Sequence, residues 1–156
     1  MKKILGLFLL LAGLAAAETA SPFYTSQELG LLVRLPPGWT ATEQPGVLRV
    51  AEPGGLAQVT FRIVRGKDAR QVWKNTLADL QKEHEDFEVV QDLVLTEQRC
   101  LVLGRYSEKG SEMTGSYAVV PFPGGFQVSR SEARAASLSR VADWLRAVTE
   151  SATPVK

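Results

Sequence analysis

The segment Ala57–Leu95 has the sequence AQVTFRIVRGKDARQVWKNTLADLQKEHEDFEVVQDLVL, and its pattern of apolar residues decides the fold. Over Ala57–Val64 apolar and polar residues alternate, which is the period of a half-buried strand. Gly66 interrupts the alternation. Asp68, with Gln71 three residues later, forms a capping-box pattern that predicts the start of a helix.

The helix predicted from Asp68 has one apolar stripe. Residues at spacings of three and four form it: Trp73, Leu77, Leu80, His84 and Phe87. From Phe87 to Leu95 the period of two returns, with Val89, Leu93 and Leu95 assigned to one side. The segment therefore predicts strand, helix and strand, with one apolar face carried through all three.

The rest of the chain supplies more strands and a second helix. Strands are predicted at Leu29–Leu35, Val47–Ala51, Cys100–Tyr106, Met113–Val120 and from Phe126 to about Arg130. The segment Cys100–Tyr106 is apolar on both faces, as is typical of a central strand. Ser131 is expected to cap a closing helix. This order predicts an α+β fold, a mostly antiparallel sheet packed by a long central helix and a C-terminal helix.

The N-terminus has the pattern of a signal peptide. Lys2 and Lys3 precede the apolar run Ile4–Leu14, and Ala15–Ala17 offers a cleavage site of small residues. The run is shorter than the ~20 apolar residues that span a membrane. We expect an exported protein, periplasmic or secreted, without a stable membrane anchor after cleavage near Ala17. An uncleaved N-terminal anchor is the alternative.

The expected domain organisation is simple. Residues 1–17 form the signal peptide, 18–28 a flexible lead-in, 29–150 a single α+β domain and 151–156 a frayed C-terminus. Without the two leader lysines the chain has sixteen basic and seventeen acidic side chains. Such a balance gives no field for nucleic acid, so no nucleic-acid partner is expected.

The sequence resembles the PsbP-like or Mog-type superfamily. The resemblance rests on the strand end Leu35-Pro36-Pro37-Gly38-Trp39, the long amphipathic helix, the restart Phe87–Val90, a strand ending at Tyr106 and the closing helix. It implies an antiparallel sheet between helices and the role of a binding or accessory module, as in a small exported bacterial member of that superfamily. None of the metal-binding or photosystem-binding residues of PsbP is carried over.

The residues that would support catalysis are few. His84 is the single histidine, and as a general base or metal ligand it would need acids that Glu83 and Glu85 cannot supply if they point away from it on the helix. The other interpretation is a histidine at the helix boundary, stabilised by the C-terminal dipole. The only cysteine, Cys100, sits in an apolar strand and is interpreted as a small core residue. We expect no enzymatic activity, no cofactor and no metal.

Two features are candidates for binding. Phe122 lies between two prolines in a turn, where it could anchor a partner or fold back over the sheet, and Phe126 follows in the next strand. The second feature is a cationic set at the junction of strand and helix that could receive a carboxylate or form a solvated rim: Arg62, Arg65, Lys67 and Arg70.

The sequence therefore favours an exported, non-enzymatic binding or accessory module that meets a protein partner at the cell envelope. The alternative is a carrier of a small apolar or lipidic ligand held between the sheet and the helix. A carrier requires a large cavity, for which the lining residues would be Leu77, Leu80, Tyr117 and Val119.

Overall fold

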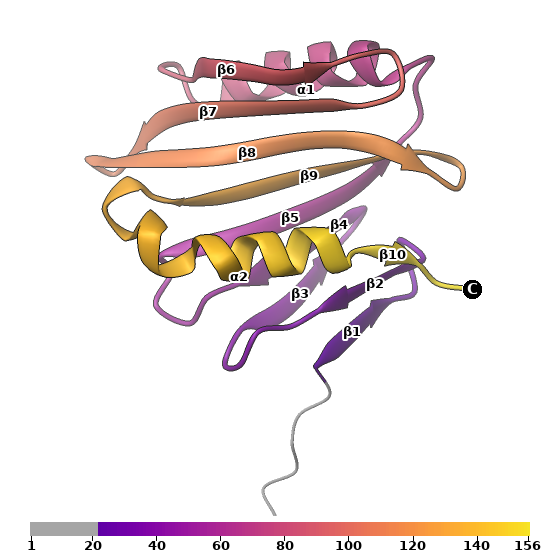
Figure 1. The fold of residues 1–156 in the computed structure, drawn as a ribbon, viewed down its shortest axis with the longest axis horizontal. Helices are drawn as coiled ribbons and strands as arrows, with labels where there is room; N and C mark the ends of the chain where they lie inside the picture. Colours follow the sequence, from indigo (N-terminus) through magenta and orange to yellow (C-terminus); the bar gives the residue numbers. More distant parts are fainter. Residues whose placement is uncertain (1–21) are drawn as a thin grey trace, which may run out of the picture.

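A computed structural model describes residues 22–156. They form two sheets and two α-helices (Figure 1). The predicted signal peptide, residues 1–17, lies outside the described residues. The larger sheet has seven strands, antiparallel throughout, in this spatial order: β3 (Thr40–Gln44), β4 (Val47–Ala51), β5 (Ala57–Val64), β9 (Gly125–Arg134), β8 (Ser111–Phe122), β7 (Cys100–Glu108) and β6 (Glu88–Leu95). The predicted α+β class with a mostly antiparallel sheet is confirmed.

A second, smaller sheet packs near the C-terminal helix. It consists of β1 (Phe23–Ser26), β2 (Leu31–Arg34) and β10 (Thr153–Pro154), with β2 in the middle. The helices are α1 (Ala69–Glu83), a 3₁₀ turn η1 (Ala135–Ser137) and α2 (Leu138–Ser151).

The predicted start of α1 is confirmed. The Asp68 carboxylate accepts a hydrogen bond from the Gln71 N–H at 2.8 Å, which satisfies one of the free donors of the first turn. The Gln71 side chain accepts a hydrogen bond from the Lys67 N–H, whereas a capping box would use the N–H of Asp68. The inward side of α1 buries Val72, Trp73 and Leu80 against the sheet.

The two helices lie on opposite sides of the seven-stranded sheet. Figure 1 shows α1 behind the sheet and α2 in front of it. α1 packs on β8 and β7, whereas α2 packs on β9, β5 and β2. We call these two sides of the sheet the α1 face and the α2 face. Each face has its own core cluster, one around Tyr117 and Trp73 and the other around Phe61 and Val59.

Each helix covers only part of its face. On the α1 face, the side chains of β3 to β5 are exposed or half-buried, among them Thr42, Arg49 and Thr60. On the α2 face the uncovered part lies over β6 to β8, where Leu101 and Leu103 are half-buried. Among the described residues, two half-faces of the sheet on opposite sides are therefore open.

Several expectations about the chain ends are wrong. The lead-in contains β1, and the segment expected to fray contains β10, because both pair with β2 and satisfy its hydrogen-bonding groups on its two sides. The Arg34 N–H also donates to the Ser151 hydroxyl at 2.8 Å. The prediction that Ser131 caps the closing helix is wrong as well. Ser131 pairs with Val59 within β9, and α2 begins only at Leu138.

The prediction that the apolar face continues into β6 is also wrong. Two β-bulges, between Val89 and Gln91 and between Asp92 and Val94, shift the register of β6 on β7. Each bulge adds one residue and breaks the alternation of sides. As a result Leu93 and Leu95 are 46% and 37% exposed, although the sequence assigned both to the core side.

Burial of the α1 stripe can be tested with one substitution made at two sites. Leu80→Ala should lower the free energy of unfolding by about 2–5 kcal/mol, because it leaves a cavity between helix and sheet. Leu93→Ala removes the same atoms from an exposed bulge and should change stability by less than about 0.5 kcal/mol. Urea unfolding followed by tryptophan fluorescence measures both, and equal losses at the two positions would contradict the burial described here.

Candidate functional site

The candidate site begins at Arg130 in the middle of β9. Alternate residues of this strand, Val128, Arg130 and Glu132, face the α1 side of the sheet. The Arg130 guanidinium donates from Nη1 to Glu83 Oε2 at 2.8 Å and from Nη2 to Glu132 Oε1 at 3.1 Å. Since Glu83 is the last residue of α1, Arg130 ties the end of the helix to the centre of the sheet.

Glu132 is the most buried acidic side chain near Arg130, with 1% exposure. Besides Arg130 it accepts hydrogen bonds from the Tyr117 hydroxyl and from the Gln58 amide, each at 3.1 Å. Donors from β5, β8 and β9 thus converge on one carboxylate. Among the described residues no buried side-chain nitrogen or oxygen lacks a hydrogen-bond partner. Both carboxylate oxygens of Glu132 are therefore engaged in hydrogen bonds that join the three strands.

The surroundings of this cluster shift the pKa values of Arg130, Tyr117 and Tyr106. Burial would lower the pKa of Arg130, but the charge of Glu132 and the hydrogen bonds to Glu83 and Glu132 outweigh it and raise the pKa. Burial, supported by the negative charge of Glu132, raises the pKa of both Tyr117 and Tyr106. The arginine therefore stays charged and both phenols stay neutral over the ordinary pH range.

His84 lies at the boundary of α1, as one interpretation of the sequence predicted. It is the C-cap residue in an extended conformation, and its ring stacks on Tyr106 with 3.7 Å between centroids. The expectation that Glu83 points away is wrong, because His84 has left the helical conformation and its Nε2 lies 4.0 Å from Glu83 Oε2. Among residues 22–156 no group of three or more His, Cys, Asp or Glu side chains is placed to hold a metal ion.

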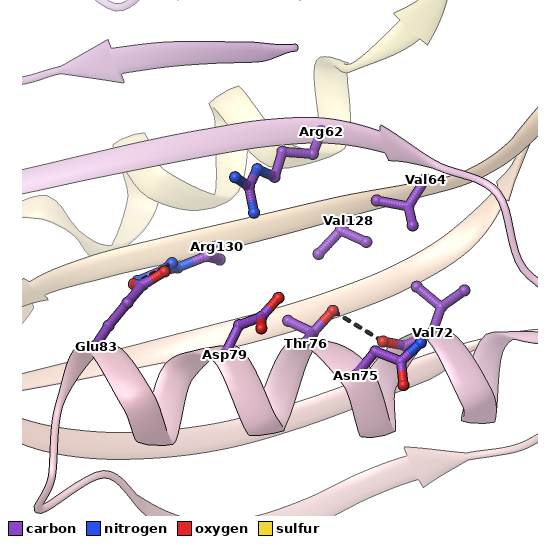
Figure 2. Close-up of a pocket in the computed structure, with 9 residues that line it drawn as sticks. All are labelled: Arg62, Val64, Val72, Asn75, Thr76, Asp79, Glu83, Val128 and Arg130. Carbon is purple, nitrogen blue, oxygen red and sulfur yellow. Dashed lines mark hydrogen bonds and ion pairs between the residues drawn. The ribbon is translucent and has the colours of Figure 1, made fainter. Parts of the chain in front are cut away.

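Two hollows lie on either side of the Arg130–Glu132 pair. The first, of about 70 Å³, opens between α1 and the strands β5 and β9 (Figure 2). Val64, Val72 and Val128 line it together with polar side chains: Arg62, Asn75, Thr76, Asp79, Glu83 and Arg130.

The second hollow, of about 290 Å³, lies on the other side of Glu132. Its lining includes Arg49, Gln58, Lys109, Glu132 and Arg134, with Glu108 at the β7–β8 turn. Arg130 lines the first hollow and Glu132 the second, so the hydrogen-bonded pair lies between the two. We call the residues of both hollows the polar groove.

The polar groove has cations that are available to a ligand. Glu83 and Glu132 are bound to Arg130, and Asp79 lies 3.9 Å from Lys82. Arg62, Arg134 and Lys109 form no ion pair with another described residue, and Arg49 only donates to the Gln58 amide oxygen at 2.7 Å. The groove can therefore receive carboxylates or other anions. One carboxylate of the groove, that of Glu108, also forms no ion pair with a described residue.

The structure separates the cationic set expected at the strand–helix junction. Arg62 lines the first hollow, and Arg65 is exposed in the loop after β5. Arg70 is on the first turn of α1 and donates to the Leu95 carbonyl at 3.0 Å, which fastens α1 to the end of β6. Lys67, the fourth member of the set, is exposed before α1, so only Arg62 of the four belongs to the polar groove.

The two phenylalanine candidates lie on opposite faces of the sheet. Both are half-buried in the β8–β9 hairpin, where Phe122 pairs with Gly125 and Phe126 with Pro121. Phe122 packs against the core cluster of the α2 face, and Phe126 packs against that of the α1 face. This arrangement corresponds to the expected alternative in which Phe122 folds back over the sheet. The assignment of either as a binding residue stays a prediction.

The sequence analysis missed Glu132, Arg134 and the central role of Arg130. The available signal was the alternation of charged residues at 130, 132 and 134, which is typical of one side of a strand. The helix expected from Ser131 concealed it. Arg49 was visible as the one charged residue of a short apolar strand but had no predicted partner.

The residues proposed to line a ligand cavity are packed within the core. Leu80, Tyr117 and Val119 have no exposed surface, and Leu77 is half-buried beside them. Neither hollow described above is lined by any of the four. In the part of the chain that the structure describes, no helix is long and apolar enough to cross a membrane.

Comparison with known proteins identifies the fold. No protein-family model matches the chain, and no curated protein sequence matches it. The solution structure of cyanobacterial PsbP (CyanoP) from Synechocystis superposes with a TM-score of 0.61 at 13% identity, covering 85% of this chain and 91% of that one. A Bacteroides thetaiotaomicron crystal structure gives a TM-score of 0.54 at 13% identity, covering 86% of this chain and 48% of that one.

LpqN of Mycobacterium tuberculosis, described as involved in cell envelope biogenesis, gives a TM-score of 0.43 at 14% identity over 79% of this chain and 82% of that one, which is too low to carry an argument. The CyanoP superposition shows a PsbP-like fold, as the resemblance in sequence predicted.

Removal of Arg130 tests the buried cluster. Arg130→Met should lower the free energy of unfolding by about 3–5 kcal/mol, because Glu132 is left as a buried charge without its counterion. The double variant Arg130→Met with Glu132→Gln should recover at least half of that loss, since the amide still accepts from Tyr117. Arg105→Met, which breaks an exposed pair with Glu88, is the control and should barely move the urea midpoint. A double variant no more stable than the single one would contradict this account.

The buried phenols predict a loss of stability at alkaline pH. The pKa values of Tyr106 and Tyr117 are raised in the folded state, whereas both are near 10 in the unfolded chain. Their contribution is therefore complete below about pH 10 and falls as the pH rises above it. Urea midpoints across this range should fall less steeply in Tyr106→Phe than in the parent protein. Phenolate absorbance from both residues in the folded protein near pH 10 would contradict the prediction.

Proposed function

We propose that this PsbP-like chain is a non-enzymatic accessory module that acts at the cell envelope and binds an acidic surface of a partner protein in the polar groove. The envelope location rests on the leader pattern of the sequence, with Lys2 and Lys3 before an apolar run and three alanines. The choice of partner rests on the charges of the α1 face.

One observation carries the proposal. Arg49 and Arg62 lie in the open half of the α1 face, and Arg134 lies at the end of the neighbouring strand β9. None of the three forms an ion pair with a described residue, while Arg130 occupies the carboxylates of Glu83 and Glu132. A guanidinium presents a fork of donors that matches a carboxylate. This half-face is thus complementary to carboxylates that another protein presents.

The size of the groove favours a macromolecular partner. Pockets that enclose a small molecule usually measure ~300–1,000 Å³, and the first hollow is several times smaller. The second is larger, but four of its nine lining residues are charged side chains that remain exposed: Arg49, Glu108, Lys109 and Arg134. The groove is lined from α1, β4, β5, β9 and the β7–β8 hairpin, and a contact area spread over several elements is typical of a protein interface with a polar rim.

The chemistry of the groove supports binding rather than catalysis. Its buried carboxylate is fully hydrogen-bonded, and its buried phenol, Tyr117, has a raised pKa. His84 stacks on Tyr106 and lines neither hollow. A general base or nucleophile needs a free lone pair within reach of a substrate, and the groove provides none among these groups.

Charge reversal within the groove tests the proposed function. A photo-crosslinking amino acid at Thr60, in the open half of the α1 face, should capture one acidic protein in the protein's own envelope. Arg49→Glu, Arg62→Glu and Arg134→Glu together should reduce that capture at least about tenfold, because they replace attraction with repulsion. Added salt should reduce it in the parent protein.

The matched control reverses three exposed arginines elsewhere, Arg34, Arg140 and Arg146, and should leave capture unchanged. Equal losses in both triple variants would mean that net charge alone is responsible and would contradict a groove site. Native mass spectrometry of protein purified from the envelope addresses the carrier. A lipid-sized adduct on most molecules would overturn the proposal in favour of that alternative.

A further inference from the structure

Arg49 differs from the other available cations of the polar groove because its guanidinium is held in place. Its Nε–H donates to the side-chain oxygen of Gln58 at 2.7 Å. Three other cations line the groove and have no side-chain partner among the described residues: Arg62, Arg134 and Lys109. Only one cation available to a ligand is therefore fixed in direction.

The orientation of the Gln58 amide is set from the core. Arg49 pairs with Thr60 on β5, so Gln58 lies at a diagonal position that a long side chain reaches. Gln58 pairs with Glu132 on β9, and its Nε2 donates to Glu132 Oε2 at 3.1 Å. A carboxylate can only accept and a guanidinium can only donate, so the amide nitrogen must face Glu132 and the amide oxygen must face Arg49.

Glu132 is a fixed base for this chain of hydrogen bonds. It is 1% exposed and also accepts from the Tyr117 hydroxyl and from Arg130. Gly115, which pairs with Glu132 on β8, leaves the space for this contact. A Cβ atom at Gly115 would lie 2.9 Å from the Tyr117 hydroxyl and 3.1 Å from Glu132 Cγ. Hydrogen bonds therefore run without interruption from the buried cluster to Arg49.

This arrangement leaves the end of the Arg49 guanidinium free. Because Nε–H is bound to Gln58, the two terminal nitrogens, Nη1 and Nη2, remain, and they donate to no residue in the part of the chain that the structure describes. Arg49 lines the second hollow. Two parallel N–H donors match the two oxygens of one carboxylate. A side chain that is already held loses less conformational entropy on binding than a free one.

We propose that Arg49 determines the specificity of the polar groove: it binds one carboxylate of the partner end-on through Nη1 and Nη2, and Gln58 is its positioning residue. This inference rests on the proposed function and names the chemistry that the groove recognises. Arg62, Arg134 and Lys109 then add attraction without a fixed geometry.

The acidic residues of the second hollow favour a carboxylate over a phosphate. Glu108 and Glu132 line the same hollow as Arg49. A phosphate ester carries a charge of about −1.5 to −2 and three acceptor oxygens, so it is repelled more strongly by both acids. A carboxylate has one charge and two oxygens, as many as the free nitrogens of Arg49. The carboxylate can belong to an acidic side chain or to the C-terminus of a chain, and both sources share this chemistry.

Titration with short peptides tests the ligand class. The ¹⁵N-labelled protein at low salt is given four peptides: one capped at both ends with a central glutamate, the same with glutamine, the glutamine peptide with a free C-terminal carboxylate, and a capped phosphoserine peptide. We expect the Arg49 Nε–H and Gln58 side-chain amide signals to shift. A peptide with a carboxylate should bind at least about fivefold tighter than the capped glutamine peptide.

The tighter of the two carboxylate peptides identifies the source of the carboxylate. No preference for either over the capped glutamine peptide, or tightest binding of the phosphoserine peptide, would overturn the proposal.

Substitutions that keep the charge separate the fork of donors from the net charge. Arg49→Lys should weaken the tighter carboxylate peptide at least about fivefold, because an ammonium group cannot bind both oxygens in a fixed plane. Arg62→Lys and Arg134→Lys are the matched controls and should each change binding less than about twofold. Equal losses in all three variants would refute a special role for Arg49.

Gln58→Met tests the positioning role. It should weaken peptide binding in the parent protein but not in the Arg49→Lys variant, since Gln58 acts through Arg49. The Arg49 Nε–H signal should also move in Gln58→Met without any peptide. Urea midpoints show whether each variant is folded, and the exposed Arg49→Lys keeps the proposal testable if Gln58→Met is not. The same loss in both backgrounds would contradict positioning.

The crosslinking assay from Thr60 distinguishes this inference from the proposed function. Arg49→Lys should reduce capture of the acidic partner at least about fivefold. If it captures like the parent protein while the triple charge reversal does not, the groove acts through net charge; the proposed function then stands and the role of Arg49 is refuted. If neither variant alters capture, both are refuted.

Discussion

One helix cannot cover a face of a seven-stranded sheet, and this constraint shapes the whole molecule. Seven strands at ~4.8 Å spacing are nearly three helix diameters wide, and each face has one helix. α1 and α2 are placed toward opposite edges and flank the central strand β9, which is the most completely buried strand of the sheet. What remains open is the β3–β5 half on one side and the β6–β8 half on the other.

The Arg130 cluster marks the border between the covered and the open part of the α1 face. Replacing a buried ion pair with apolar side chains is often neutral or stabilising, so stability alone does not explain why charges are placed there. Their geometric effect is specific. Arg130 binds the last residue of α1 and a buried carboxylate of β9 at once, which fixes the helix end over the sheet and defines both hollows.

Local patterns predicted the elements whose signals are contained in one stretch of sequence. The alternation in β5 and the Asp68 cap of α1 needed no partner to be recognised. β1 and β10 were missed because their stability comes from β2, which for β10 lies more than a hundred residues away in sequence. Ser131 has the propensity of a helix cap, but pairing with Val59 outweighs that preference.

The candidate site was less predictable than the fold. Arg62 was recognised from its neighbours in sequence, yet its partners in the groove come from α1 and β9. The order of strands decides which residues meet, and no short segment encodes the placement of β9 beside β5 or of β6 at the edge. The apolar character of both sides of β7 was correctly detected. β7 lies inside the sheet, between β8 and β6, but its α2 side is only half-buried, because coverage depends on where α2 lies.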